Sequence, residues 1–138
     1  MKLPAIVQVR ISDLAKNPYP LCLETATAGI FEQFAWNQTL AQLELTYKVH
    51  VSEPVLKPLQ ESDTGASLEA VISISDVKTS YLELRYVLFR DRDIHACAEF
   101  KARIFCYDTH AQQIDWPPGL KAEFDAAWFE QNWSDDSD

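Results

Sequence analysis

The chain has 138 residues, and its 21 acidic against 12 basic side chains give a formal net charge of −9. Such an excess of negative charge is repelled by nucleic-acid phosphates and by anionic membrane surfaces, which excludes both as partners. Hydrophobic residues make up 47% of the chain, enough for one globular core, but no charge-free run is long enough to cross a bilayer.

The cysteines and glycines restrict the chemistry further. Cys22, Cys97 and Cys106 are odd in number and show no paired spacing. We therefore expect no disulfide framework, no metal site and a reducing, cytoplasmic location. The glycines are too few and too scattered for a phosphate-binding loop. The apolar stretch at the start of the chain is too short and too often interrupted by polar residues for a signal peptide. We predict a single domain over residues 1–133, followed by an acidic tail over 134–138.

The first half of the chain predicts a strand, a helix and a second strand. β-Branched residues indicate a strand over 4–11, which ends before the proline-containing loop that follows. Apolar residues then recur at helical spacing, predicting one long helix over 23–40. Gly29 inside this helix costs roughly 1 kcal/mol relative to Ala, which indicates that another element packs closely against its backbone. Residues 43–51 alternate as in a half-buried strand, and 53–67 predict an irregular loop.

The second half predicts three consecutive strands and a short helix. Alternation over 68–74, 82–88 and 94–106 is regular, and each segment places its apolar residues on one face. Charge predicts the register of the last hairpin: paired residue numbers sum to 184, so that Glu83 meets Lys101 and Arg85 meets Glu99. Trp116 and two prolines end the strand region, and 120–129 fits an amphipathic helix through Leu120, Phe124, Ala127 and Trp128.

One helix with five antiparallel strands predicts an α+β fold in which the sheet wraps around the helix. This order resembles the hot-dog fold, and in particular the acyl-CoA thioesterases related to 4-hydroxybenzoyl-CoA thioesterase. The resemblance covers roughly residues 5 to 130 and rests on pattern and length. Its stretches are VQVRISD, GIFEQF with Glu32, LELTYKVHVSEPV, SLEAVISISDV, YLELRYVLFRD and HACAEFKARIFCYD.

The resemblance implies hydrolysis of an acyl-CoA thioester to a free acid and CoA. The substrate carbonyl would lie at the helix N-terminus, where the amides near Cys22 and Leu23 would stabilise the oxyanion. Asp13, at the end of the first strand, is the candidate catalytic carboxylate, and Glu24 in the first helical turn is the second. Tyr19 is a candidate for lining the acyl pocket. No cofactor is expected beyond the CoA moiety of the substrate.

The loop between strand and helix departs from the family pattern of two acidic residues followed by Gly. Depending on the alignment, the second acidic position falls on Ala15 or on Asn17, and Pro18 to Pro20 replace the glycine. Asn17 can orient a water or a carbonyl but cannot act as a general base. The alternative function is therefore a non-catalytic hot-dog domain that binds a ligand or serves assembly.

The resemblance also implies association of subunits. Hot-dog sheets pair edge to edge with active sites at the subunit boundary, so a homodimer or a dimer of dimers is expected. Because CoA is anionic and the chain carries −9, a local cation must assist binding. Lys16, Lys48 and Lys57 are the candidates. His50, His95 and His110 are expected on the solvated surface.

Overall fold

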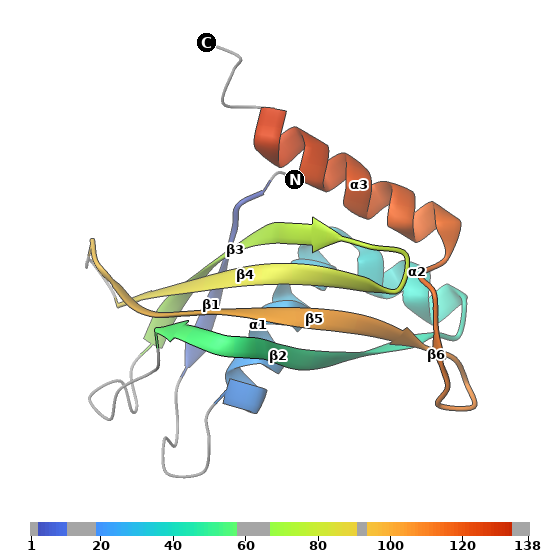
Figure 1. The fold of residues 1–138 in the computed structure, drawn as a ribbon, viewed down its shortest axis with the longest axis horizontal. Helices are drawn as coiled ribbons and strands as arrows, with labels where there is room; N and C mark the ends of the chain where they lie inside the picture. Colours follow the sequence, from blue (N-terminus) through green and yellow to red (C-terminus); the bar gives the residue numbers. More distant parts are fainter. Residues whose placement is uncertain (1–2, 11–18, 58–66, 91–93, 134–138) are drawn as a thin grey trace.

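A computed structural model describes residues 3–10, 19–57, 67–90 and 94–133. One antiparallel sheet has the strand order β1-β3-β4-β5-β2, with β6 added to β5 (Figure 1). Its strands are β1 (Ala5–Arg10), β2 (Thr46–Lys57), β3 (Ser67–Val77), β4 (Tyr81–Arg90), β5 (Ala96–Tyr107) and β6 (Gln113–Ile114). The helices are α1 (Tyr19–Gln33), α2 (Trp36–Gln42) and α3 (Pro118–Trp133).

The sheet curls around α1, which contacts β1, β2 and β3. In Figure 1, α1 lies behind the sheet and α3 runs along the β3 side. The predicted α+β architecture, with an antiparallel sheet wrapped around a central helix, is confirmed. The boundaries of the single domain stay a prediction, and the acidic tail over 134–138 lies outside the described residues.

Gly29 is the point where α1 packs on β1. A Cβ atom built at Gly29 would lie 2.5 Å from Cγ1 and 2.9 Å from Cγ2 of Val7, closer than carbon atoms can approach. The predicted close packing partner of this glycine is therefore confirmed, and it is the buried side chain of Val7. The missing side chain lets helix and strand approach each other directly.

The prediction of one long helix over 23–40 is wrong. α1 begins earlier, at Tyr19, and ends at Gln33, and a separate α2 follows. The break falls at Ala35, whose backbone is left-handed with φ of 59°. Packing explains the break, because the turn brings Phe34 into a stack on Trp36 with ring centroids 4.6 Å apart. Trp36 itself is buried in the core, which offsets the cost of the strained residue.

The bounds predicted for the following strand are also wrong. Leu43 caps the C-terminus of α2 and is 49% exposed, and Glu44 has φ of 57°, so the extended segment starts only at Thr46. At its other end β2 continues to Lys57, through part of the predicted loop, and Lys57 pairs with Glu99 after a bulge. A bulged edge strand accommodates proline, because one side of its backbone is not needed for the ladder. The loop residues 58–66 lie outside the described residues.

The three consecutive strands are confirmed, but the predicted β4–β5 register is wrong. From Tyr81 to Leu88 the paired numbers sum to 186, as in Tyr81 with Phe105, so Arg85 faces Lys101. This register places Tyr86 opposite Phe100, and the two buried rings stack with centroids 5.2 Å apart. A shift by two residues keeps each side chain on its face, so burial alone does not distinguish the two registers.

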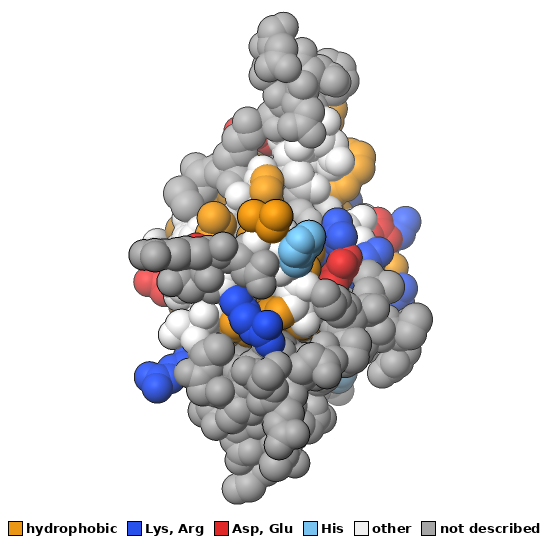
Figure 2. Space-filling view, turned by 90° about the vertical axis from the view of Figure 1, so that its left-hand side faces the viewer, with side chains coloured by type: hydrophobic (Ala, Val, Ile, Leu, Met, Phe, Trp, Pro, Cys, Tyr) orange, Lys and Arg blue, Asp and Glu red, His pale blue; other side chains and the backbone are white. Residues whose placement is uncertain are grey.

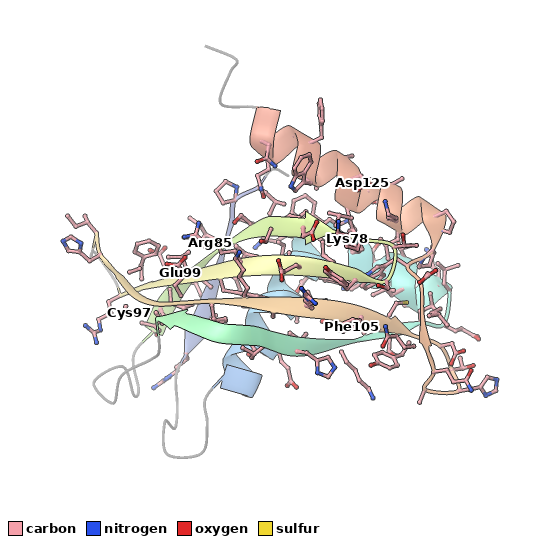
Figure 3. All side chains as sticks on the ribbon, in the orientation of Figure 1. Lys78, Arg85, Cys97, Glu99, Phe105 and Asp125 are labelled. Atoms are coloured by element: carbon pink, nitrogen blue, oxygen red, sulfur yellow. The ribbon has the colours of Figure 1, made fainter. Side chains whose placement is uncertain are left out.

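Ion pairs are still satisfied in the observed register. Glu83 lies directly opposite Arg103, with a carboxylate oxygen 3.3 Å from Nε. Arg85 reaches Glu99 across the diagonal, as Figure 3 shows on the outer face of the sheet. Diagonal neighbours are within reach of long side chains, so the unfavourable Arg85–Lys101 pairing is compensated. The prediction failed because it counted directly opposite charges alone.

The predicted inner faces of β3, β4 and β5 form the core except at the start of β5. Ile94, expected inside, is 85% exposed, and Ala96 is only half-buried, whereas Cys97 is buried instead. The register shift between Leu88 and Phe89 inserts an extra residue there and reverses the alternation at the start of β5. The buried core also holds an aromatic cluster beside α1, formed by Phe31, Trp36, Trp116 and Phe124.

The C-terminal segment is more structured than the sequence suggests. β6 was not predicted, and α3 extends over Pro118–Trp133 instead of 120–129. Leu120 and Phe124 are buried as predicted, whereas Trp128 is 41% exposed, which corrects its assignment to the apolar face. α3 contacts β3, where Gln131 rather than Trp128 faces the sheet. No helix in the described part of the chain is long and apolar enough to cross a membrane.

Candidate functional site

A pocket of about 520 Å³ lies where α1 passes the β2 edge of the sheet. Two positions of α1 and four consecutive positions of β2 line it: Glu24, Ala28, Tyr47, Lys48, Val49 and His50. β2 is the last strand of the sheet, and its outer edge has no neighbouring strand among the residues that the structure describes. The pocket therefore combines an open sheet edge with the first half of the central helix.

Helical spacing explains why α1 contributes Glu24 and Ala28. Residues four apart lie on one face, and both of these side chains are exposed. The adjoining positions Leu23 and Thr27 point the other way and are buried. Thr27 is held there by a hydrogen bond of 2.6 Å between its hydroxyl and that of Tyr86 on β4. This buried contact fixes the rotation of α1 and with it the direction of Glu24.

The β2 residues of the pocket come from both faces of the strand. Tyr47 and Val49 are half-buried on the inner side, whereas Lys48 and His50 are exposed on the outer side. Because consecutive strand residues point to opposite faces, a pocket lined by four of them reaches both the inner and the outer face of the sheet at the β2 edge. It thus has an apolar inner wall of Ala28, Tyr47 and Val49 and a cationic outer rim.

Tyr47 and Glu24 interact electrostatically inside the pocket. Burial raises the pKa of Tyr47 above its usual value, and the negative charge of Glu24 raises it further. The tyrosine is a neutral hydrogen-bond donor at neutral pH, and its ring packs on Phe31 with centroids 4.6 Å apart. Lys48 lies over the ring of Tyr107, 4.6 Å from its centroid, which holds the ammonium at the rim.

The structure places the predicted site residues unequally. Asp13 and Asn17 lie outside the described residues, so their roles stay predictions. Tyr19 and Cys22 belong to the first turn of α1, and their side chains lie outside the described part. Leu23 belongs to the second turn, and its side chain is buried in the core with 2% exposed. Only its backbone could therefore face a ligand near the start of the helix.

Among the predicted carboxylates, Glu24 is the one the structure places in a pocket. The earlier start of α1 moves its free amides toward Tyr19 and Leu21, since Pro20 has no N–H and the amide of Leu23 falls within the hydrogen-bonded helix. Glu24 lies about one helical turn from those amides. The arrangement brings a carboxylate, a phenol and a helix N-terminus to one end of α1.

The sequence did not identify Tyr47, Ala28 or Val49 as site residues. Their alternation marked β2 as half-buried, but nothing in it indicated which residues lie beside α1. Lys48 was named as a possible cation for CoA, and His50 was expected on the surface, where it lies. In the described part of the chain, no group of three or more His, Cys, Asp or Glu side chains could hold a metal ion.

Comparison with known proteins identifies the fold. No protein-family model and no curated protein sequence matches the chain. The hypothetical protein TT1821 from Thermus thermophilus has 13% identity and a TM-score of 0.65, covering 89% of this chain and 98% of its own. The gentisyl-coenzyme A thioesterase BH1999 has 11% identity and a TM-score of 0.65, covering 85% and 99%. Slr0204, a 1,4-dihydroxy-2-naphthoyl-CoA thioesterase from Synechocystis, has 11% identity and a TM-score of 0.56, covering 93% and 98%.

These similar structures are thioesterase-like proteins of the hot-dog fold. The predicted resemblance is thereby confirmed for the fold, over nearly the whole length of both chains. Identities of 11–13% carry no residue-by-residue correspondence. The function of this chain has to be argued from its own pocket.

Proposed function

We propose that this protein hydrolyses an acyl-CoA thioester to a free acid and CoA in the pocket between α1 and β2. The observation that carries the proposal is the position of Glu24, which lines the pocket opposite Tyr47 and close to the start of α1. Two structurally similar proteins are CoA thioesterases, which favours thioester chemistry for a protein of this fold.

Thioester hydrolysis needs a carboxylate and an oxyanion donor. In the proposed reaction the Glu24 carboxylate takes a proton from a water that attacks the thioester carbonyl, or attacks it directly. The free amides at the start of α1 stabilise the oxyanion that develops there, because the helix dipole favours negative charge. Collapse of the tetrahedral intermediate breaks the C–S bond and expels the CoA thiolate, which takes up the proton that Glu24 removed from the water. Where Glu24 attacks directly, the same collapse leaves an acyl–Glu24 anhydride, and a water then hydrolyses it to the free acid and the restored carboxylate. Asp13 remains the alternative carboxylate.

The open β2 edge supports a second part of the proposal, association of two copies. An exposed strand edge offers unpaired N–H and C=O groups for another strand. We infer that a second copy pairs along this edge, as a homodimer or within a dimer of dimers, so that the pocket lies at a subunit boundary. A reducing cytoplasmic location is proposed on the buried thiol of Cys106, which is not part of a disulfide.

Kinetics of paired variants tests the proposed reaction. Short, long and aromatic acyl-CoAs are supplied, and release of CoA thiol is followed. Glu24→Gln is expected to lower kcat/KM by about 10²–10⁴-fold, the range for loss of a general base. The matched control is Glu32→Gln, an exposed carboxylate two turns further along the same helix.

The outcomes of these measurements identify the catalytic carboxylate or contradict the hydrolysis. Unchanged turnover in Glu24→Gln together with loss in Asp13→Asn transfers the catalytic role to Asp13. No turnover of any thioester by the unmodified protein contradicts the proposed reaction. Binding of an acyl-CoA without turnover then supports the alternative, a non-catalytic hot-dog domain, for which Asn17 at the second acidic position is the sequence argument.

A further inference from the structure

Besides Glu24, the inner side of the pocket carries a second polar group, the hydroxyl of Tyr47. Tyr47 is half-buried on β2, and Glu24 lies on the facing wall formed by α1. Neither side chain has a hydrogen-bond partner among the described residues. The pocket therefore offers a bound molecule one hydrogen-bond donor and one acceptor, held on opposite walls.

The charged groups on the outer face of the sheet differ, because they pair with one another. A carboxylate oxygen of Glu83 lies 3.3 Å from Nε of Arg103. Figure 2 shows basic and acidic side chains interspersed along this face, which forms its right-hand profile. Groups that satisfy each other are less available to a ligand than groups without a partner. The donor and acceptor inside the pocket are therefore the stronger candidates for contacts with a substrate.

Packing holds the ring of Tyr47 in place. The ring lies on that of the fully buried Phe31, with centroids 4.6 Å apart, and Tyr47 pairs with the buried Cys106 of β5. Because Phe31 belongs to α1 and Tyr47 to β2, the contact joins the two walls of the pocket. A donor fixed in this way can bind a charge as it develops, without first reorganising.

The start of α1 supplies fewer donors for an oxyanion than most helices do. Pro20, the second residue of α1, has no N–H, which removes one of the amides that a helix N-terminus leaves free. An oxygen that becomes negative between α1 and β2 therefore benefits from a donor on the strand. Lys48 and His50 lie on the outer side of β2, so Tyr47 is the residue of the pocket lining that offers a donor on the inner side.

The phenol remains protonated in this position. Burial raises the pKa of Tyr47 above its usual value, and the negative charge of Glu24 raises it further. At neutral pH the hydroxyl can therefore donate a hydrogen bond without giving up its proton. This property suits a group that stabilises a negative oxygen and is unchanged at the end of the reaction.

We propose that Tyr47 is a further catalytic residue, whose hydroxyl donates a hydrogen bond to the thioester carbonyl oxygen in the transition state. The assignment rests on the proposed hydrolysis. As the attacking oxygen bonds to the carbonyl carbon, the π pair of the C=O bond moves onto the carbonyl oxygen, and the hydrogen bond from Tyr47 strengthens. On collapse that pair forms the C=O bond again, and the pair of the C–S bond leaves with the sulfur. Tyr47 keeps its proton throughout, whereas the proton of the attacking water passes through Glu24 to the thiolate.

Kinetics of Tyr47→Phe tests the assignment, because this substitution removes the hydroxyl and keeps the ring on Phe31. The substrate is the acyl-CoA that is turned over fastest among short, long and aromatic ones. We expect kcat to fall by about 10²-fold, the effect of losing one oxyanion donor. KM should stay within about twofold, because the lost interaction forms only in the transition state. The free energy of unfolding in urea should be unchanged.

Two inhibitors distinguish an oxyanion donor from a residue that only shapes the pocket. The first is a fluorinated ketone analogue of the acyl-CoA, which adds water or a carboxylate to give a tetrahedral oxyanion. The second is the matching CoA thioether, in which a methylene replaces the carbonyl. Tyr47→Phe should weaken inhibition by the ketone by a factor similar to the fall in kcat and leave inhibition by the thioether unchanged.

The matched control is Tyr81→Phe, which removes a phenol hydroxyl on β4, outside the pocket, where it lies 3.5 Å from Oδ2 of Asp76. It should leave kcat and both inhibition constants unchanged. An unchanged kcat in Tyr47→Phe would overturn the assignment, as would equal weakening of both inhibitors.

Failure of the assignment and failure of the hydrolysis give different results. Loss of turnover in Glu24→Gln with full turnover in Tyr47→Phe would refute the donor role and preserve the hydrolysis. Ketone inhibitor binding, measured by calorimetry, that depends on the Tyr47 hydroxyl in a protein that turns over no thioester would preserve the donor and refute the hydrolysis. Absence of turnover together with ketone binding that is indifferent to Tyr47→Phe would refute both.

Discussion

The two edges of the sheet differ in whether side chains hydrogen-bond to the outer backbone groups. At the β1 side, Gln33 donates from Nε2 to the carbonyl oxygen of Ile6 at 3.1 Å. Beyond the end of β1, Gln131 of α3 accepts from the amide of Ile74 at 2.8 Å and donates to its carbonyl at 3.0 Å. At the β2 side, no described side chain bonds to the backbone of residues 46–51, and a pocket is there instead.

The difference shows how one fold separates stability from function. A glutamine side chain carries the same amide as the backbone, so Gln131 continues the ladder of β3 where β1 stops and blocks further strand pairing. The β2 edge keeps its backbone groups available and has α1 with Glu24 beside it. Ligand and partner are therefore expected at the β2 edge and not at the β1 edge.

The largest effect is expected from proline in the open edge. Successive N–H groups of a strand point in opposite directions, so one of Val49 and His50 donates into the β5 ladder and the other toward the open edge. We expect one of Val49→Pro and His50→Pro to unfold and the other to keep its fold as a monomer, while the unmodified protein is a dimer. Circular dichroism and sedimentation velocity measure both properties. A folded proline variant that is still a dimer would show that pairing does not use this edge.

At the closed edge, adding a methyl group to α1 tests the packing on β1. Gly29→Ala should lower the free energy of unfolding by about 2 kcal/mol, because Val7 is branched and buried and cannot move aside. In a Val7→Ala background the same substitution should be neutral or stabilising by up to about 1 kcal/mol, the helix-propensity gain. Urea denaturation of the unmodified protein, the two single variants and the double variant gives the coupling free energy between positions 7 and 29.

A second helical glycine supplies the control. A Cβ atom at Gly119 would meet nothing within 4 Å, so Gly119→Ala should not destabilise the protein. Equal effects at Gly29 and Gly119 would contradict the steric argument.

Removing the side-chain amide that closes the β3 edge should have a smaller effect. Gln131→Ala leaves the N–H and C=O of Ile74 without their partner, and we expect a loss of about 1 kcal/mol in the free energy of unfolding, because water can partly replace the amide at the sheet edge. Amide exchange at Ile74 should accelerate. Asn132→Ala is the comparison, because that exposed side chain bonds within its own helix to the carbonyl of Trp128. Unchanged exchange at Ile74 would mean that Gln131 does not close the edge.

The smallest expected effect is a pH dependence of stability that reports whether water reaches the core behind the β2 edge. Cys106 pairs with Tyr47 across the β2–β5 ladder, and burial raises its thiol pKa to about 11, with Asp108 adding to the shift. Since the unfolded thiol ionises near its usual pKa of 9.0, the stability due to this group is full below that pH and is lost as the pH rises toward about 11. The stability difference between the unmodified protein and Cys106→Ala should therefore narrow between pH 8 and pH 11 in urea denaturation. A constant difference would indicate that water reaches the thiol.

Single residues of the candidate site could be predicted from the sequence, but their arrangement around the pocket could not. Glu24 and Lys48 were named from the sequence because charge and position along an element are local properties. Their meeting in one pocket was not predicted, because it depends on the rotation of α1, held by the hydrogen bond between Thr27 and Tyr86. The roles of Asp13 and Asn17 remain predictions.

The sequence by itself determined which faces of β3, β4 and, beyond its bulged start, β5 enter the core, and that the backbone of Gly29 meets another element, because alternation and side-chain size act locally. Only the tertiary structure decided the β4–β5 register, the break at Ala35 and the difference between the two sheet edges. Each depends on contacts between residues far apart in the chain: Tyr86 with Phe100, Trp36 with Phe124, and Gln131 with Ile74. Local pattern assigns a side chain to a face, whereas long-range packing selects which neighbour it meets there.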